Sequence, residues 1–362
     1  MSRYDPWRRR LEHIQHQGQF RTLRTLEPTG PVTATHDGRP VLLACSNDYL
    51  GLAWDPEVRA AARGGGSTGS RLISGSRPVH AQLEDALAEH FGRPALLFNS
   101  GYQANLAVYS TLVQSDGRIA SDRANHASMI DGMRLSSARR TVFAHADPSA
   151  IPPDTTLIAT EGLFSMDGDV PDFSRYPTEP WLAVDEAHAF GALGPGGRGA
   201  AAAQGIQPDA IVGTFGKAMG VSGAFVVGPP ELKSLLINAG RSFIFTTAMP
   251  EPVAAMALAA LKRATDDLRD RLRCNARFLR AHLRDRGWKV LGEHHICPVV
   301  VGDGAVPLST SLLREGIFAP AIRYPTVPRG QERIRLTVSA AHDNSQLERV
   351  AEAMGQPTVP VR

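Results

Sequence analysis

The chain has 362 residues, of which 43% are hydrophobic and 21% are charged, and its formal net charge is +3. These values are typical of a globular protein with two or three lobes, and no Lys/Arg block with interleaved aromatic residues indicates nucleic-acid binding. No apolar run approaches the ~20 residues that span a bilayer, and the N-terminus lacks the apolar core of a secretory signal. We therefore expect neither a membrane protein nor a nucleic-acid-binding protein.

The first part of the chain predicts a polar helix and a turn within residues 1–30, followed by a short strand in "PVLLACSNDYLGL". Further on, "GGGSTG" at residues 64–69 matches the G-x-G-x-x-G pattern of dinucleotide sites. That pattern needs a strand directly before it, and the preceding "PEVRAAAR" has a helical composition instead. We therefore predict a flexible loop near the active site or a subunit interface.

Residues 94–227 contain short apolar runs that each end in polar residues or glycine, with helical stretches between several of them. The runs are "PALLFNSG", "GRIASD", "TTLIATEG", "PWLAVDEAH", "DAIVGTFGK" and "GAFVVG". Such alternation predicts a mostly parallel sheet covered by helices on both faces, with ligands at the carboxyl ends of the strands.

The last third begins with one alanine-rich helix, "EPVAAMALAALKRATDDLRDRL", and continues with strands in "CPVVVGD" and "RIRLTVS". We predict an N-terminal helix/strand segment (1–45), a large α/β domain (46–248) and a small C-terminal α+β domain (249–362). The cysteines at positions 45, 274 and 297 form no CxxC pair, which favours a reducing cytoplasm over a disulfide framework or zinc ribbon. We expect all three to be small core residues.

Reactive side chains follow several of the predicted strands. They are His126, Glu161, Ser165, Asp185, His188, Thr214 and Lys217, together with a Gly101–Tyr102 turn that opens a helix. Each has an ordinary alternative role, because Lys217 could be a solvated charge, Asp185 a helix N-cap and His126 a surface imidazole.

One chemistry needs all of these groups, namely catalysis with pyridoxal phosphate. It requires a lysine amine for the aldehyde, a carboxylate that keeps the pyridine nitrogen protonated, and a flat side chain against the ring. It also requires a helix N-terminus for the phosphate. Lys217, Asp185, His126 and the Gly101–Tyr102 turn supply these groups, so the sequence predicts a pyridoxal phosphate enzyme with Lys217, Asp185 and His126 as catalytic residues. It predicts no metal site.

The ordered motifs also resemble a known family, the α-oxoamine synthases, which are fold-type I pyridoxal phosphate enzymes. The resemblance covers about residues 20–355 and rests on "SNDYLGL", "FNSGYQAN", "NHASMIDG", "TEGLFSMDGD", "VDEAHAFGALG", "TFGKAMGVSGA" and "AIRYPTVPRGQERIRLTVSAAH". It implies an aspartate aminotransferase-like α/β fold, with a large domain around a mostly parallel sheet and a smaller α+β C-terminal domain. It also implies a cytoplasmic homodimer with shared active sites.

The lysine loop and "AIRYPTVP" are most similar to the branch that acts in biotin biosynthesis. That branch condenses L-alanine with a pimeloyl thioester, carried by coenzyme A or acyl carrier protein, and releases CO2. Two alternatives within the family are glycine C-acetyltransferase activity and an autoinducer-type condensation. An alternative from another class is a non-catalytic binding protein that keeps the fold, although the presence of both Lys217 and Asp185 argues against it.

The resemblance implies a role for each residue around the cofactor ring. Lys217 forms the covalent bond to the cofactor and then moves the α-proton of the substrate, and Asp185 pairs with the pyridine nitrogen. His188 and Ser165 approach the phenolic oxygen of the ring. His126 stacks on the ring and orients the thioester carbonyl.

It also implies contacts to the cofactor phosphate. Gly101 and Tyr102 present backbone N–H groups, and Thr214 adds its hydroxyl. Thr246 and Thr247 resemble the phosphate contact that comes from the partner subunit.

The substrate residues follow from the same resemblance. Asn47 and Arg335 match positions that hold the amino acid, with Arg335 paired to its carboxylate. Arg21, Arg323 and Thr326 match positions near the acyl substrate.

The chain departs from the family pattern at Ala189, where glycine is usual, and is shorter around residues 59–66 and 144–155. We expect the shortened segments to reshape the acyl entrance and to leave the catalytic set intact.

Overall fold

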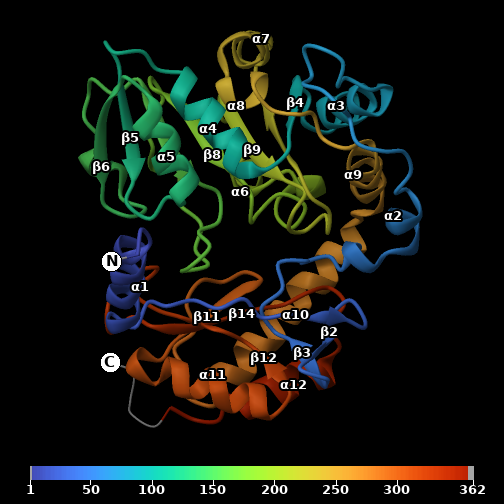
Figure 1. Cartoon of the computed structure of the whole chain (residues 1–362), viewed down its shortest axis with the longest axis vertical. Coiled ribbons are helices and arrows are strands. Elements are labelled where there is room, and N and C mark those ends of the chain that lie inside the picture. The colour runs from blue at the N-terminus through green and yellow to red at the C-terminus, as the bar shows by residue number, and fades with distance from the viewer. Residues whose placement is uncertain (1, 358–362) are drawn as a thin grey trace.

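The short apolar runs form a seven-stranded sheet in the upper lobe of the computed structural model, which describes residues 2–357 (Figure 1). Its strand order is β4-β10-β9-β8-β7-β5-β6, and β10 is antiparallel to both of its neighbours. The strands are β4 (Ala95–Phe98), β5 (Arg118–Asp122), β6 (Arg139–Phe143), β7 (Leu157–Glu161), β8 (Trp181–Asp185), β9 (Ala210–Thr214) and β10 (Ala224–Val227). The predicted mostly parallel sheet is therefore confirmed.

Helices cover both faces of this sheet, because successive strand residues point to opposite sides. In β10, Ala224 and Val226 pack in one apolar cluster with α4, α5, α7 and α8, whereas Phe225 and Val227 pack in another with α3 and α9. The helices of this lobe are α3 (Pro78–Phe91), α4 (Gly101–Thr111), α5 (Ala127–Leu135), α6 (Ala200–Ala203), α7 (Pro230–Ala239), α8 (Arg241–Ile244) and α9 (Glu251–Arg263).

The lower lobe combines both ends of the chain (Figure 1). Its strands are β1 (Glu27–Pro28), β2 (Thr33–His36), β3 (Arg39–Leu43), β11 (Ile296–Val300), β12 (Ile317–Phe318), β13 (Ala321–Ile322) and β14 (Arg333–Thr337). Its helices are α1 (Asp5–His16), α10 (Asp266–Asp285), α11 (Ala305–Arg314) and α12 (Asn344–Ala353), whereas α2 (Pro56–Ala60) packs against α9 of the upper lobe. Strand β3 pairs in parallel with β12, so the N-terminal strands and β12 form one sheet. The predicted domain limits stay a prediction.

Three local predictions need comment. The alanine-rich helix is in fact two helices, because Thr265 is extended (φ −84°, ψ 162°) and α10 restarts with Asp266 and Asp267 in its first turn, where acids stabilise a helix N-terminus. Strand β6 was missed, since it is an edge strand whose "RRTVF" is mostly exposed. The cysteine at position 274 lies exposed rather than in the core, while Cys297 is buried and Cys45 half-buried.

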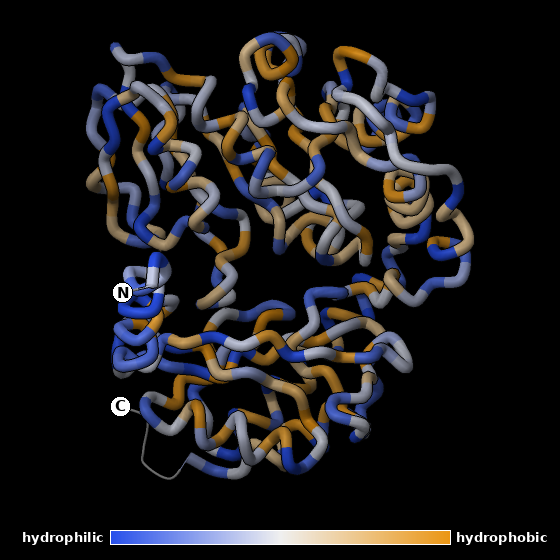
Figure 2. Tube along the Cα trace, viewed as in Figure 1, coloured by the Kyte–Doolittle hydropathy of each residue, from blue (hydrophilic) through white to orange (hydrophobic). Residues whose placement is uncertain are grey.

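Other local expectations are confirmed. The polar N-terminal helix α1 buries no residue and is hydrophilic over most of its length (Figure 2). The glycine-rich segment 64–69 follows α2 and not a strand, which is inconsistent with a dinucleotide site. Within residues 2–357, no helix is both long and apolar enough to cross a membrane.

Candidate active site

The loop after β9 places Lys217 in a half-buried position between the two lobes. Backbone bonds from Phe215 N to Gly223 O (2.9 Å) and from Gly220 N to Lys217 O (2.8 Å) close this loop. Gly220 has a φ of +66°, and a Cβ there would lie 2.1 Å from Ala53 N, so no other residue fits. The loop therefore holds the lysine in a defined place.

The surroundings of Lys217 lower the pKa of its amine. Burial lowers this pKa to about 8; the charge of Arg335 acts in the same direction, and the carboxylates of Asp185 and Glu161 oppose it. At pH 7 about a tenth of the amine is therefore unprotonated and able to act as nucleophile or base.

Asp185 ends β8 and is oriented by neighbours from other elements. Its Oδ2 accepts a hydrogen bond from Asn105 Nδ2 (2.7 Å), and its Oδ1 accepts one from Ala187 N (2.9 Å). The same Asn105 amide donates to Ser128 Oγ (2.9 Å), which in turn lies 2.7 Å from His126 Nδ1. One chain of hydrogen bonds therefore positions both Asp185 and His126.

His126 caps α5 and is exposed at the surface of the chain. Ser128 N donates to its Nδ1 (3.3 Å), so that nitrogen is an acceptor and Nε2 carries the proton. Burial lowers the pKa of His126, even though the charge of Asp185 opposes this. The ring is therefore a neutral, flat surface at neutral pH, as expected of a group that stacks on a cofactor.

His188 is buried and joined to Tyr49 and Asn47. The hydroxyl of Tyr49 donates to Asn47 Oδ1 (3.0 Å), and His188 Nδ1 lies 2.7 Å from the same hydroxyl oxygen. Because the single hydroxyl proton goes to Asn47, His188 donates from Nδ1 and keeps Nε2 as an acceptor. Burial, together with the positive charges of Lys217 and Arg335, holds the pKa of His188 well below its usual range.

Arg335 lies on β14 and links two loops of the site. Its Nε donates to Ser165 O, and its two terminal nitrogens lie 3.3 and 3.4 Å from Asn47 Oδ1. The structure therefore joins Asn47, His188 and Arg335 through hydrogen bonds that include Tyr49, and places the backbone carbonyl of Ser165 beside Arg335; the roles predicted for these residues stay predictions.

The start of α4 has the geometry that a phosphate site requires. Within the described residues, the backbone N–H groups of Gly101 and Tyr102 have no acceptor, as is usual in the first turn of a helix. A Cβ on Gly101 would lie 3.9 Å from Thr214 Cβ, so the two residues are neighbours. The Thr214 hydroxyl donates to Gly223 O (2.9 Å), so its bond to a phosphate requires a change of partner and stays a prediction.

Thr246 and Thr247 lie beside the start of α4 in the same protomer. Asn99 Nδ2 donates to Thr246 Oγ1 (3.3 Å) and to Thr247 O (2.7 Å). The contact of these two threonines with the cofactor phosphate of a partner subunit stays a prediction. The Tyr102 side chain is exposed and donates to Asp131, so only its backbone faces the cradle.

The three residues predicted near the acyl substrate cluster at the edge of the lower lobe. Arg323 donates to Phe20 O (3.0 Å), which places it next to the exposed Arg21, and Thr326 N donates to Arg323 O (3.0 Å). No hydrogen bond between described residues joins this group to Lys217.

Sequence reasoning missed four residues of the site: Tyr49, Asn105, Ser128 and His295. His295 is buried against Tyr49, with ring centroids 4.0 Å apart, and its Nε2 lies 3.0 Å from His188 O. Helical spacing could have found Asn105, since it lies four residues after Gly101 on the same side of α4. No local signal marks His295, because its partners are more than a hundred residues away.

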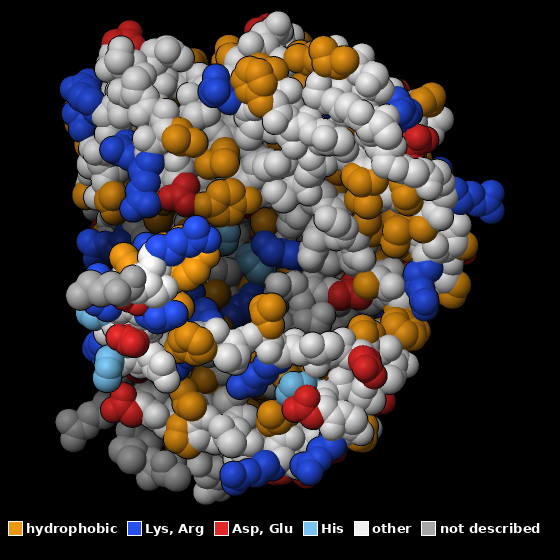
Figure 3. All heavy atoms as spheres, in the orientation of Figure 1, with side chains coloured by type: hydrophobic (Ala, Val, Ile, Leu, Met, Phe, Trp, Pro, Cys, Tyr) orange, Lys and Arg blue, Asp and Glu red, His pale blue; other side chains and the backbone are white. Residues whose placement is uncertain are grey.

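These groups fit pyridoxal phosphate. Three groups lie close to one another at the ends of strands. They are an amine with a lowered pKa, a buried and oriented carboxylate, and the first turn of a helix, whose N–H groups have no acceptor. Lys217, Asp185, and Gly101 with Tyr102 would hold the aldehyde, the pyridine nitrogen and the phosphate, respectively. Figure 3 shows that the surface is hollowed between the two lobes, with basic and histidine side chains inside.

Comparison with known proteins shows the family of the chain. Residues 39–354 match the family of class I and II aminotransferases. The chain is 41% identical to the 8-amino-7-oxononanoate synthase of Acidithiobacillus ferrooxidans (strain ATCC 53993 / BNL-5-31) over 382 aligned residues, which cover 97% of this chain and 98% of that protein. The chain belongs to the 8-amino-7-oxononanoate synthase family. Members of this family are pyridoxal phosphate-dependent acyltransferases of biotin biosynthesis, and the fold and cofactor predicted from sequence are thereby confirmed.

Solved structures place the family in a wider group. A serine palmitoyltransferase from Sphingomonas wittichii superposes with a TM-score of 0.89 at 31% identity, over 98% of this chain and 96% of that chain. The 8-amino-7-oxononanoate synthase of Francisella tularensis superposes with a TM-score of 0.76 at 29% identity, over 87% of this chain and 96% of that one. The fold is thus shared by acyltransferases with different substrates, and substrate choice depends on individual residues.

Proposed function

We propose that this chain condenses L-alanine with a pimeloyl thioester of coenzyme A or acyl carrier protein. The products are 8-amino-7-oxononanoate, CO2 and the free thiol. The main support is the environment of Lys217, a half-buried lysine with a pKa of about 8 that lies among Asp185, Glu161 and Arg335. An amine in that state can remove a proton from carbon, and a nearby arginine can hold the substrate carboxylate.

The residues of the chain divide the work. Bound pyridoxal phosphate supplies an electron sink that makes a carbanion at the substrate α-carbon accessible. Arg335, braced by Asn47 and the Ser165 carbonyl, binds the carboxylate of alanine and orients its Cα–H bond toward Lys217. Lys217 takes the α-proton and returns a proton to the same carbon after CO2 has left. The Asp185 carboxylate would accept a hydrogen bond from the pyridine nitrogen and so keep that nitrogen protonated.

Other residues orient the second substrate. Neutral His126 presents Nε2–H, a donor suited to the thioester carbonyl oxygen, where negative charge develops during attack. Arg21 and Arg323 place two cations near the edge of the lower lobe, where they can pair with the distal carboxylate of a pimeloyl chain. A chain that ends in an ester would not need them.

We also propose a cytoplasmic homodimer with shared sites. Ile73 and Phe245 are 85% and 71% exposed, which is unusual for large apolar side chains and supports burial against a second copy. Phe245 directly precedes Thr246 and Thr247, the residues expected to reach the partner's site. The cysteines form no disulfide within the described residues, consistent with a reducing compartment.

A side-by-side assay tests the reaction. Purified enzyme with pyridoxal phosphate is given L-alanine, glycine or L-serine with pimeloyl, acetyl or palmitoyl thioesters, and products are identified by mass spectrometry. We expect alanine with the pimeloyl thioester to give the highest kcat/KM. Lys217→Ala should abolish turnover, whereas Lys233→Ala, which removes an amine paired with Glu84 (3.2 Å), should not. Faster turnover of glycine with acetyl-CoA would show that the assignment is wrong.

A further inference from the structure

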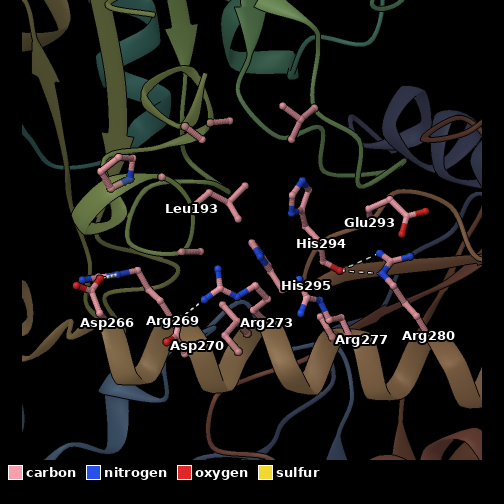
Figure 4. A pocket seen from close by; sticks show the side chains of 18 of the residues that line it. Leu193, Asp266, Arg269, Asp270, Arg273, Arg277, Arg280, Glu293, His294 and His295 are labelled. Atoms are coloured by element: carbon pink, nitrogen blue, oxygen red, sulfur yellow. Dashed lines mark hydrogen bonds and ion pairs between the residues drawn. The ribbon is translucent and has the colours of Figure 1, made fainter. Parts of the chain in front are cut away.

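A second cavity lies between the lobes and is not used by the proposed reaction. It has a volume of about 1130 Å³ and lies between α10 and the loop that follows β8 (Figure 4). Ala192, Leu193 and Pro195 form an apolar wall on the loop side. Such a volume, with one apolar wall and a few charged groups, is typical of a small-molecule site.

The α10 side of this cavity is strongly basic. Its arginines are Arg269, Arg273, Arg277, Arg280 and Arg284, and the acids that line the cavity are Asp266, Asp270 and Glu293. The arginines therefore exceed the acids by two positive charges, and His294 lines the same space. An excess of positive charge in a partly enclosed cavity attracts anions.

The arginines differ in how many hydrogen bonds and ion pairs they already form. Arg280 is buried and donates to the carbonyl oxygens of residues 291, 292, 294 and 296, so its charge acts at a distance and its N–H groups are used. Arg269 pairs with Asp266 (2.8 Å) and Arg284 with Glu293 (2.7 Å). These three contribute potential more than direct contacts.

Arg273 and Arg277 are the available pair. They are exposed and one helical turn apart, and their side chains extend from α10 toward the loop that carries Leu193 (Figure 4). Arg273 contacts Asp270 in an exposed pair, a kind of interaction that contributes little and can exchange. Among residues 2–357, Arg277 forms no ion pair with a carboxylate. Two neighbouring guanidinium groups match the adjacent oxygens of a pyrophosphate.

The cavity is lined by other residues than those assigned to the cofactor and substrates. Lys217, Asp185, His126, His188 and Arg335 do not line it. His295 lines the cavity, and its ring packs 4.0 Å from that of Tyr49 while its Nε2 lies 3.0 Å from His188 O. A ligand in this cavity would therefore contact a different set of side chains from those of the proposed reaction.

We propose that this interlobe cavity binds a small molecule that carries a pyrophosphate group. The pyrophosphate lies between Arg273 and Arg277, with His294 beside it, and the rest of the ligand packs on the apolar wall at Leu193. Because the wall belongs to the upper lobe and the arginines belong to α10, the ligand bridges the two lobes.

Isothermal titration of the holoenzyme with sodium pyrophosphate tests this site. Enzyme saturated with pyridoxal phosphate is used, so that the catalytic phosphate cradle is filled. The variant Arg273→Gln/Arg277→Gln is compared with Arg271→Gln/Lys262→Gln, which removes the same charge from exposed positions outside the cavity. We expect one equivalent to bind to the wild type, at least tenfold weaker binding to the first variant, and unchanged binding to the second.

The remaining outcomes are decisive. Absence of binding by the wild type, equal loss in both variants, or no loss in Arg273→Gln/Arg277→Gln would each overturn the proposal. The single variant Arg277→Gln, with a circular dichroism spectrum of native shape, serves if the double variant misfolds. Displacement of pyrophosphate by ADP or by coenzyme A distinguishes a nucleotide from an acyl carrier as its source. Because the readout is binding, it is independent of whether the proposed condensation occurs.

Discussion

Replacing His145 by glutamine should destabilise the protein in a pH-dependent way. His145 Nδ1 lies 3.1 Å from Asp122 Oδ1, and its Nε2 lies 3.0 Å from Asp169 Oδ2, so both nitrogens donate and the ring is a cation. Burial lowers the pKa of His145, but the hydrogen bonds and charges of Asp122 and Asp169 outweigh it and raise that pKa to about 10. This ion triad joins the loop after β6 to the loops that carry His126 and Ser165.

The magnitude follows from the pKa. The rise from 6.5 to about 10 corresponds to roughly 5 kcal/mol if it is converted in full, at 1.36 kcal/mol for each pH unit. The side chains of His145 and Asp169 are 30% and 34% exposed, so solvent screens part of this energy. We therefore expect His145→Gln to lower the free energy of unfolding by about 2–3 kcal/mol at pH 6.5.

The sign of the pH dependence is set by the raised pKa. The stabilisation by the histidine cation is complete below pH 6.5 and disappears as the pH rises through 10. Urea unfolding of wild-type and variant holoenzyme at pH 6.5 and 10.5 measures the difference between them at each pH. We expect this difference to fall below about 1 kcal/mol at the higher pH. His16→Gln, on the exposed face of α1, is the control and should show no difference. A difference that stays constant from pH 6.5 to 10.5 would refute the reasoning.

Three further predictions concern the site itself. The rate at which apoenzyme binds pyridoxal phosphate, measured by absorbance, should rise about tenfold from pH 7 to pH 9 and then stay constant, because the pKa of Lys217 is about 8. A rate that still rises tenfold per pH unit above pH 9 would contradict this. Arg335→Lys should raise the KM for alanine by about 10- to 100-fold with a smaller change in kcat, because lysine cannot form the two parallel hydrogen bonds of arginine to a carboxylate. An unchanged KM would show that Arg335 does not bind alanine. Gly162→Ala should lower the free energy of unfolding by about 1–3 kcal/mol, because its Cβ would lie 1.9 Å from Glu186 Oε2. Thermal unfolding of Gly162→Ala and of Gly65→Ala measures this effect, because a Cβ on Gly65 has no atom within 4 Å and its φ is not positive. Equal stability losses in the two variants would contradict the crowding at Gly162.

The sequence by itself determined the sheet and the reacting groups. Short, continuous apolar runs that end in glycine or polar residues favour strands buried on both faces, because they are too short for helices, and polar residues at the ends of parallel strands meet at one edge. That is why Asp185, Lys217 and the Gly101 turn could be assigned to one site from their order alone. The motifs around these residues are contiguous in the sequence, so they could be recognised without knowing which distant segments pack beside them.

Only the tertiary structure decided how those groups are held and what lies around them. Three contacts join residues 80 or more positions apart. They are the hydrogen bond between Asn105 and Asp185, the hydrogen bond between His188 and Tyr49, and the pairing of β3 with β12. The cavity on α10 likewise depends on a loop from the other lobe. Nothing in a local pattern encodes such contacts, because they arise when several apolar surfaces are buried at once and their polar groups must find partners in the same space. Burial also set the pKa of Lys217, and no spacing of residues could have predicted it.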